Sequence, residues 1–560
     1  MLLRAVLVAA LLLVCRAAHA QEMVDLLLHG GKVATQDDSS TIVSAVAVRG
    51  GRIVAVGDES LTRRFRARRV IDLRGRLLIP GFDDTHIHIA GEARRDIDLR
   101  HVRSIHELKD SVKARAARLG RGQWITGYGW AEDDLDDHRV PLRADLDSAA
   151  PDNPVILWRA GGHSSVSSSL ALRLAGIDRT TPDPAAGMIE RDERGDATGI
   201  IRERSEIVGR LVPEPTAAEL RPSFVAALRA LLPLGITSIV QAGAPQRGPN
   251  GYSEWERVYR DHRGELPRAA VQIYWRDSAT LRAFGRRPGA GDEWLRVGAL
   301  KLLVDGGFTG PSAYTLQPYK GMPDFRGTLN YSPDSLYHIV KVAHAMGWQM
   351  GFHTIGDGAI ALAVDVFDRV LRESPRRDHR NYLNHFSMLP PVPTLQTMAR
   401  DSILVTQQPN FTYTLEARYS QTLDGDRLQH NNPVALPMQQ GIFMAFSSDV
   451  LPIGPMIGLY GAVSRRGKSG AVYGAAEAIP IARAIRAYTR NGPYLTREEK
   501  TKGTLEPGRL ADMVVMADDL LTIPPDSIRS ARVDLTILGG RVVYDRTAAA
   551  APLPSRRRSK

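Results

Sequence analysis

The sequence is almost free of cysteine, and this absence removes several kinds of chemistry. The 560-residue chain has a single cysteine, Cys15, which lies in an apolar segment near the N-terminus. If that segment is removed, no thiol is left to form a disulfide, ligate a metal or act as a nucleophile. A large exported protein does without disulfides, because its hydrophobic core is big enough. Any metal ion must therefore be held by histidines, carboxylates or a modified side chain.

A hydrophobic run long enough to span a membrane is also missing at the N-terminus. The apolar run from Ala5 to Val14 is too short to cross a bilayer as a helix, and it lies between Arg4 and the A-x-A sequence Ala18–Ala20. This pattern is typical of a secretory signal peptide, so we expect residues 1–20 to be cleaved off and the protein to be periplasmic or secreted. Lipidation of Cys15 is the less favoured alternative, because valine rather than a small residue precedes it. The mass of the exported protein distinguishes the two.

Signals for nucleic-acid binding are missing as well. The formal net charge is +11, but Arg556, Arg557, Arg558 and Lys560 lie on an Ala/Pro-rich tail, residues 547–560, which we expect to be disordered. No basic stripe with interleaved aromatic residues appears, so a solvated surface explains the charge better. We expect a small-molecule substrate, no nucleic acid and no membrane contact after signal cleavage; a homo-oligomer stays open.

The two ends of the chain share a hairpin pattern. Val24–Gly31 and Val533–Gly540 each read as a strand that ends in a Gly-Gly turn, with a second strand following. Another such hairpin is expected about Gly50-Gly51. We therefore predict a small β-sandwich domain built from both termini, residues 21–79 and 496–546.

Between these ends, strand-like and helix-like segments alternate. Capping patterns at Ser104–Glu107, Thr216–Glu219 and Ser332-Pro333 predict helix starts, and we expect the second of these helices to stop at Gly235. Apolar runs predict strands at 236–240, 270–275, 299–304, 382–386, 403–407 and 442–446. Repeated β-α units predict an α/β fold, a (β/α)8 TIM-like barrel over residues 80–495. The stretch from about 91 to 210 breaks the rhythm, and we interpret it as an insertion over the barrel mouth.

An H-x-H pair lies at the start of the region in which we expect the barrel. His86 and His88 follow the apolar run Leu77–Pro80, and side chains two apart in a strand point to the same face. Imidazoles held in this way are typical zinc ligands, although an isolated pair is weak evidence.

Four further polar residues stand at later strand-like runs. They are Lys301, His353, His385 and Asp449. Each has an ordinary explanation: Lys301 could pair with Asp305, the histidines could be satisfied in the core, and Asp449 could cap a helix. The C-terminal ends of barrel strands share one mouth, however, so residues at successive strand ends can meet there. The pattern as a whole favours a metal site.

The motifs that carry these residues resemble the amidohydrolase superfamily of metal-dependent hydrolases. Within it the chain is similar to amidohydrolase family 3, which includes N-substituted formamide deformylases. The matching motifs are PGFDDTHIH from Pro80, KLLVDG from Lys301, HTIGDG from His353, NHF from Asn384, SSDV from Ser447 and LEPGRLAD from Leu505. The resemblance covers essentially the whole chain after the leading segment. It implies hydrolysis of a C–N bond in a small molecule and leaves the substrate open.

The resemblance also implies the ligands of one or two divalent metal ions, zinc in the first place. These ligands are His86, His88 and Asp449 for the more buried ion, His353 and His385 for the second, and Lys301 as a bridging N6-carboxylysine. Chemistry supports the modification, because an unmodified lysine ammonium has no lone pair to offer a metal. Some relatives bind one metal and keep the lysine unmodified, so the number of ions stays open.

The expected mechanism is attack by a metal-activated hydroxide, with Asp449 as general acid and base. His163 is expected to hydrogen-bond the substrate or its oxyanion, or else to be a structural histidine in a Ser/Gly loop. Trp130, Trp158, Gln408 and Phe411 are expected to line the substrate pocket, with core packing as the alternative for each. An esterase or lactonase on the same site, and a non-catalytic binding protein, are the competing functions.

Overall fold

The computed structural model describes residues 21–160, 164–184, 187–248, 250–308 and 312–549. The chain divides into two compact units, one formed by the residues up to Ile89 together with those from Ala226 onward, the other by Ala90–Val225. None of the helices in the described ranges is long and apolar enough to cross a bilayer. The predicted signal peptide, His163 and most of the C-terminal tail lie outside the described residues.

The first unit contains a sheet of eight parallel strands, which confirms the predicted barrel. Its strands, in sheet order, are β8 (Phe82–Ile87), β15 (Ile236–Ala244), β16 (Arg268–Tyr274), β17 (Leu295–Leu303), β18 (Met350–Thr354), β19 (Tyr382–His385), β20 (Leu404–Gln407) and β21 (Met444–Phe446). The hydroxyl Oγ1 of Thr85 on β8 donates to the carbonyl of Phe446 on β21 (2.9 Å). The two ends of the sheet therefore meet, and the barrel is nearly closed.

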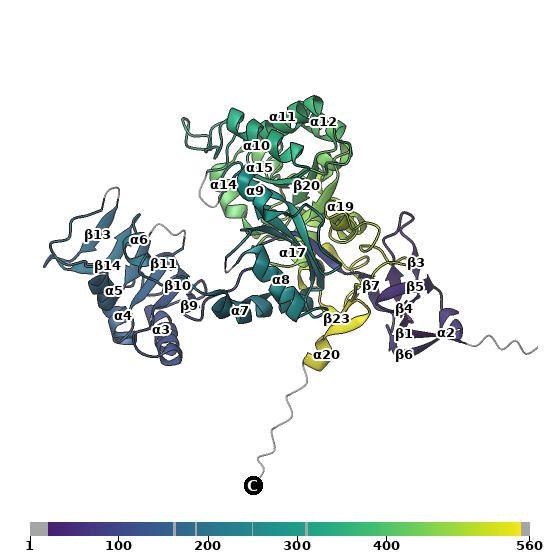
Figure 1. Cartoon of the computed structure of the whole chain (residues 1–560), viewed down its shortest axis with the longest axis horizontal. Coiled ribbons are helices and arrows are strands. Elements are labelled where there is room, and N and C mark those ends of the chain that lie inside the picture. The colour runs from purple at the N-terminus through teal and green to yellow at the C-terminus, as the bar shows by residue number, and fades with distance from the viewer. Residues whose placement is uncertain (1–20, 161–163, 185–186, 249, 309–311, 550–560) are drawn as a thin grey trace, which may run out of the picture. The chain divides into compact units, whose positions relative to one another are not determined.

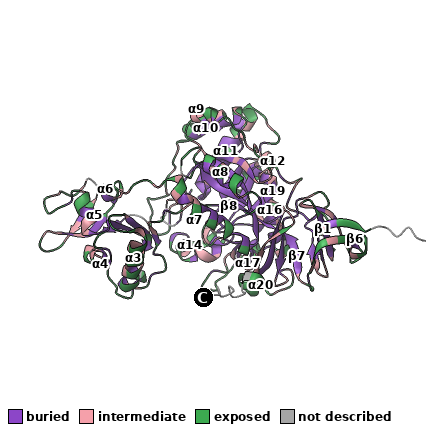
Figure 2. Cartoon of the chain, turned by 60° about the horizontal axis from the view of Figure 1, so that its bottom comes forward, coloured by how far each residue is buried: buried purple, intermediate pink, exposed green. Residues whose placement is uncertain are grey.

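These strands are buried along most of their length because both faces of the barrel wall are covered. Every residue of β15 is buried, and the barrel strands are mostly purple in Figure 2. The covering helices are α8 (Tyr252–Asp261), α9 (Ser278–Phe284), α10 (Pro333–Ala345), α11 (Asp357–Glu373), α12 (Val392–Asp401), α17 (Pro455–Ser464) and α18 (Ile481–Ala487). Helix α7 (Ala217–Arg229) precedes β15, and most of it belongs to the second unit. Short helices α13 (Phe411–Thr414), α14 (Glu416–Thr422), α15 (Gly425–Gln429) and α16 (Ala435–Gln439) follow β20.

The predicted helix starts are confirmed, but one predicted end is wrong. The hydroxyl of Ser332 accepts from the backbone N–H of Ser335 at the start of α10. Helix α7 ends at Arg229 instead of Gly235, and a 3-10 turn over Leu232–Leu234 follows it. The φ of Gly235 is +76°, a left-handed conformation that suits glycine, and it directs the chain into β15.

Two smaller sheets complete the first unit. One has the order β5 (Arg52–Gly57), β4 (Ala45–Arg49), β1 (Glu22–His29), β6 (Phe65–Asp72); the other has the order β24 (Arg541–Asp545), β23 (Val533–Leu538), β22 (Met513–Met516), β7 (Leu77–Pro80), β2 (Lys32–Ala34), β3 (Ile42–Val43). Because β22 pairs antiparallel with β7, strands from both ends of the chain lie side by side, yellow beside purple in Figure 1.

Two of the three predicted hairpins are confirmed, and one is wrong. Strands β4 and β5 pair about Gly50-Gly51, and β23 and β24 pair about Gly539-Gly540. Strands β1 and β2 flank Gly30-Gly31 but belong to different sheets. The backbone N–H of Lys32 donates to the carbonyl of Arg76 (3.0 Å), so the chain after this turn is bonded to the segment that leads into β7.

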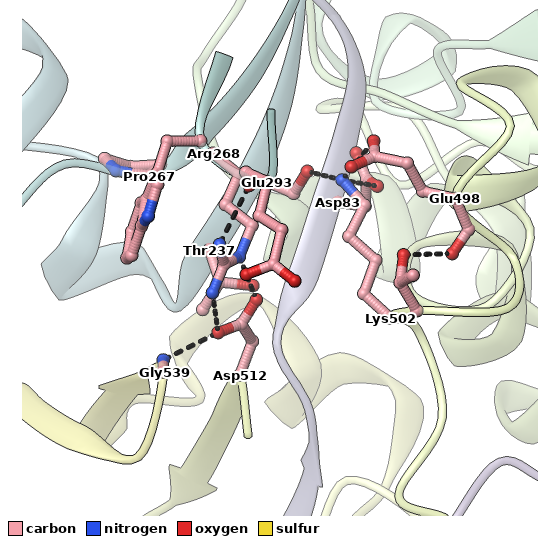
Figure 3. A network of polar contacts seen from close by, with 12 residues as sticks. Asp83, Thr237, Pro267, Arg268, Glu293, Glu498, Lys502, Asp512 and Gly539 are labelled. Atoms are coloured by element: carbon pink, nitrogen blue, oxygen red, sulfur yellow. Dashed lines mark hydrogen bonds and ion pairs between the residues drawn. The ribbon is translucent and has the colours of Figure 1, made fainter. Parts of the chain in front are cut away.

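An ion pair buried inside the first unit joins the barrel to the six-stranded sheet. The guanidinium of Arg268, at the start of β16, donates from Nε to Oδ2 of Asp512 (2.6 Å) and from Nη2 to Oδ1 (3.1 Å), as Figure 3 shows. Oδ1 of Asp512 also accepts the backbone N–H of Gly539 (2.7 Å). The Arg268 side chain is 2% exposed and lies 4.1 Å from the ring centre of Trp294.

The second unit has a six-stranded sheet of its own. Its strands, in sheet order, are β13 (Met188–Arg191), β14 (Ala197–Arg202), β12 (Ser164–Ser167), β11 (Val155–Arg159), β10 (Ile125–Trp130) and β9 (Asp96–Asp98), and its main helices are α3 (Ile105–Leu119), α4 (Arg143–Ala149) and α5 (Ser169–Leu174). Ser104 caps α3 as predicted. The unit extends to Val225, beyond the predicted insertion at about 91–210, because the first half of α7 belongs to it.

Candidate metal centre

Three of the predicted ligands converge at the C-terminal ends of the barrel strands. His86 lies near the end of β8, His385 is the last residue of β19, and Asp449 follows β21. One donor atom from each lies within 4.8 Å of those of the other two. Two imidazoles and a carboxylate at this spacing form a suitable donor set for a divalent cation.

The two remaining histidines lie next to this group. The ring centre of His88 is 5.3 Å from that of His86, and the ring centre of His353 is 4.3 Å from that of His385. Nε2 of His88 is 3.7 Å from Oδ1 of Asp449. The His88 side chain is 41% exposed, whereas the His353 side chain is 16% exposed, so His88 is on the more open side of the cluster.

Lys301 projects from β17 among these residues. It is 2% exposed, and burial lowers its pKa to about 7, an effect that the negative charge of Asp449 opposes. Its own positive charge contributes to the lowered pKa of all four histidines. A substantial part of the Lys301 amine is therefore neutral near pH 7, which is the form that reacts with electrophiles.

All four imidazoles are neutral at physiological pH. Burial, and after it the charge of Lys301, lowers the pKa of His88 to about 4 and that of His353 to about 3. Burial also lowers the pKa of His86 and His385 well below the ordinary value. A neutral imidazole keeps a lone pair on one ring nitrogen, as metal ligation requires.

Two buried amides determine which ring nitrogen of His86 and of His385 carries the proton. Nδ1 of His86 lies 2.7 Å from Oδ1 of Asn384, and Nδ1 of His385 lies 2.9 Å from Oε1 of Gln408. An amide oxygen only accepts, so both Nδ1 atoms carry the proton. Nε2 of His86 and Nε2 of His385 are buried and have no hydrogen-bond partner in the described part of the chain.

The two unpaired Nε2 atoms indicate whether the site suits a metal ion. A buried polar atom without a partner costs about 1–3 kcal/mol, and here two such atoms belong to neighbouring rings whose centres are 4.5 Å apart. One or two divalent cations bound by these Nε2 atoms, with the Asp449 carboxylate as counter-charge, would remove that cost. The residues present therefore fit a metal ion.

Asp449 is held in place by its backbone. Its N–H donates to the carbonyl of His86 (2.9 Å), and its φ is +57°, a left-handed conformation that is uncommon outside glycine and that marks functional sites. Burial raises the pKa of Asp449 to about 6, and the charge of Lys301 opposes the rise. This value lies near the range that suits a group that takes up and releases a proton.

The alternative ion pair between Lys301 and Asp305 is wrong. The carboxylate of Asp305 accepts the backbone N–H groups of Tyr314, Ile355 and Gly356 at 2.9 to 3.4 Å, and it is 3.9 Å from Nε2 of His353. Asp305 therefore joins the loop after β17 to the loop after β18.

The predicted substrate-lining residues separate into different roles. Trp130 is 1% exposed and donates its indole N–H to Leu157 (3.1 Å), so it is a core residue of the second unit. Trp158 borders a cleft of about 280 Å³ in the same unit. Both ends of the fully buried Gln408 amide are used, by His385 and Ser447, so it is not a free pocket residue. Phe411 is stacked on His385, with ring centres 6.3 Å apart.

Asn384 is the residue of this site that sequence reasoning missed. It directly precedes a predicted ligand, and regular strand alternation would place neighbouring side chains on opposite faces. The φ of His385 is +75°, which breaks that alternation, and the Asn384 amide reaches His86 on β8. The position of Asn384 within the Asn-His-Phe motif was the available signal.

Comparison with known proteins agrees with this geometry. The sequence model of the amidohydrolase family matches residues 69–544. The chain is 26% identical over 549 residues to YtcJ of Bacillus subtilis (strain 168), covering 93% of this chain and 99% of that protein. It is 26% identical over 551 residues to the N-substituted formamide deformylase of Arthrobacter pascens, covering 94% and 100%.

A solved structure shows the same fold. An uncharacterized metal-dependent hydrolase from Pyrococcus horikoshii OT3 has a TM-score of 0.73 and 24% identity, over 90% of this chain and 99% of that one. Because the family match extends over most of the sequence, this chain belongs to the amidohydrolase family.

Proposed function

We propose that this metal-dependent hydrolase cleaves a C–N bond of amide type in a small molecule. The observation that carries the proposal is the convergence of His86, His385 and Asp449, with a buried, unpaired Nε2 on each of the two histidines. The similarity to a protein named N-substituted formamide deformylase supports the choice of an amide-type bond.

The proposed ligand set extends to the neighbouring residues. We infer that His86, His88 and Asp449 hold one divalent ion, zinc in the first place, and that His353, His385 and a carboxylated Lys301 complete a second position. A bound divalent ion supplies Lewis acidity and lowers the pKa of water at the site. Asp449 takes the proton of the attacking water on its carboxylate oxygen and passes it to the leaving nitrogen.

The surroundings of the centre favour an apolar acyl or aryl group on the substrate. Phe411, Ile355 and Met388 belong to one buried apolar cluster, against which Leu451 also packs. Phe411 contacts His385 directly, and Ile355, Met388 and Leu451 lie within three residues of His353, His385 and Asp449. Water is excluded from this side, which strengthens electrostatic interactions at the centre.

The two smaller sheets of the first unit support the predicted β-sandwich. Leu28 and Val46 of the four-stranded sheet share one apolar cluster with Leu78, Met513 and Ile537 of the six-stranded sheet. We infer that the sheets pack face to face as one domain built from both ends of the chain.

Removal of the metal tests the proposed function. Dialysis against a strong chelator should abolish hydrolysis, and zinc should restore it. Assayed on matched N-substituted formamides, larger amides, esters and lactones, the reloaded protein should show its highest kcat/KM on an amide-type substrate. A preference for esters or lactones would leave the proposed metal centre intact and replace the proposed amide-type bond. A reloaded protein that hydrolyses none of these substrates would indicate a binding protein.

Carboxylation of Lys301 gives a separate prediction. The neutral amine attacks carbon dioxide, an N–C bond forms and a proton is released to solvent; the lowered pKa of Lys301 provides that neutral amine. Protein equilibrated with ¹³C-bicarbonate and zinc should show a carbamate resonance by NMR that Lys301→Met lacks. A short-chain carboxylic acid should restore part of the activity lost in this variant. Identical spectra for the two proteins would mean that Lys301 is unmodified.

A further inference from the structure

The side chain of Gln408 decides whether His385 is able to ligate a metal. An imidazole offers Nε2 only when its single proton sits on Nδ1. If Gln408 presented its NH₂ group to Nδ1, the proton would move to Nε2 and block ligation. Oxygen and nitrogen of an amide have nearly the same shape, so the neighbours of the amide must fix its orientation.

Ser447 provides that orientation. Its hydroxyl has one hydrogen, and Oγ donates it to the carbonyl of Gln407 (3.1 Å). Toward Gln408 the hydroxyl is therefore an acceptor, and Nε2 of Gln408 donates to it at 2.8 Å. The remaining end of the amide, Oε1, must face Nδ1 of His385.

Two threonines, Thr406 on β20 and Thr85 on β8, extend this series of hydrogen bonds. Oγ1 of Thr406 is 3.0 Å from Oγ of Ser447 and 2.6 Å from Oγ1 of Thr85. Thr85 already donates to the carbonyl of Phe446. Thr406 has a single hydroxyl hydrogen, so it donates to only one of these two hydroxyls. Thr85, Thr406, Gln408 and Ser447 are all 0% exposed, so water does not compete.

We propose that Gln408, oriented by Ser447, is a positioning residue that fixes the tautomer of His385 and makes its Nε2 available to the metal. This inference rests on the proposed function. It adds a residue outside the coordination sphere, Ser447, whose hydroxyl is linked to His385 through the side chain of Gln408. Partners of this kind typically contribute about 10- to 100-fold to metal affinity.

The test compares two neighbouring glutamines with equal burial. Gln408→Met should weaken zinc binding by about 10- to 100-fold, measured by competition with a chelator of known affinity. Gln408→Glu keeps an acceptor oxygen and should bind zinc within about threefold of wild type. Gln407 is the matched control: it is also 0% exposed, it donates to Phe386 (2.9 Å) and accepts the backbone N–H of Gln408 (2.7 Å), and its side chain has no hydrogen bond to a histidine among the described residues. Gln407→Met should lower the melting temperature and leave zinc affinity within about threefold.

A milder variant covers the case in which Gln408→Met does not fold. Ser447→Ala removes the group that orients the amide and should weaken zinc binding severalfold, with an altered visible spectrum of the cobalt-substituted protein. Wild-type zinc affinity in Ser447→Ala or in Gln408→Met, or equal losses in Gln408→Met and Gln407→Met, would overturn the inference. Wild-type protein that binds no zinc would instead overturn the proposed function.

Discussion

Asp449→Asn should lower kcat by about 10²- to 10⁴-fold and leave most of the bound metal in place. The amide keeps an oxygen at the position of the carboxylate, so it still reaches the centre, but it does not take up a proton. General acid–base help is worth about this factor, which corresponds to roughly 3–5 kcal/mol in the barrier. Steady-state kinetics and elemental analysis of the same preparation measure the two quantities.

A low kcat together with a full metal content would indicate that Asp449 has a chemical role and not only a structural one. KM should change little, because the amide fills the same space beside His88 and His86. The melting temperature provides the control, since Asp449 has a left-handed backbone that the isosteric replacement leaves in place. Undiminished kcat in fully metal-loaded Asp449→Asn would remove this residue from the mechanism.

Arg268→Met should destabilise the first unit by about 3–5 kcal/mol, because the variant leaves the carboxylate of Asp512 buried without its charged partner. The Arg268 and Asp512 side chains are 2% and 6% exposed, so solvent does not compensate for the loss (Figure 3). Thermal and denaturant unfolding of the purified variants, followed by circular dichroism, measure the effect.

Two further variants distinguish loss of pairing from loss of packing. The double variant Arg268→Met with Asp512→Leu should be more stable than Arg268→Met alone, because no buried charge is then left unpaired. Arg121→Met, which removes an ion pair between side chains that are 84% and 47% exposed, should change stability by less than about 1 kcal/mol. Equal destabilisation by Arg268→Met and Arg121→Met would contradict the role of the buried pair.

The proposed ligands could be picked out from the sequence because each of them lies at or after an apolar strand-like run. His86, Lys301, His353, His385 and Asp449 all lie in or directly after strands whose C-terminal ends meet at one mouth. Barrel geometry then converts sequence order into spatial proximity.

The roles of Gln408 and Ser447 could not be predicted from the sequence, for a different reason. Gln408 follows a strand in the same way as the ligands do, and nothing local separates a pocket residue from one that contacts His385. Its role depends on Ser447, which is far away in sequence and on another strand connection. Such pairs become visible only when two strands are placed side by side.

The turn at Gly30-Gly31 shows a similar limit. Its sequence pattern matches that of Gly539-Gly540, yet only the later pair joins two strands of one sheet. A side-chain carbon added to Gly31 would lie 2.5 Å from Cβ of Leu73, so the segment after β6 packs directly against the turn. Long-range packing, which local propensity does not encode, sends the chain to the other sheet.

The pairing of β7 with β22 has a consequence for how the protein is made. Strand β7 leads through Gly81 into the strand that carries His86, and the backbone N–H of Gly81 donates to the carbonyl of Asp512 (2.9 Å). Asp512 and Met513 must therefore be synthesised before β7, which leads into the strand that carries His86, gains these partners. A nonsense codon shortly before Met513 would remove β22, the strand that pairs with β7 just before the first barrel strand, and every proposed ligand would still be encoded.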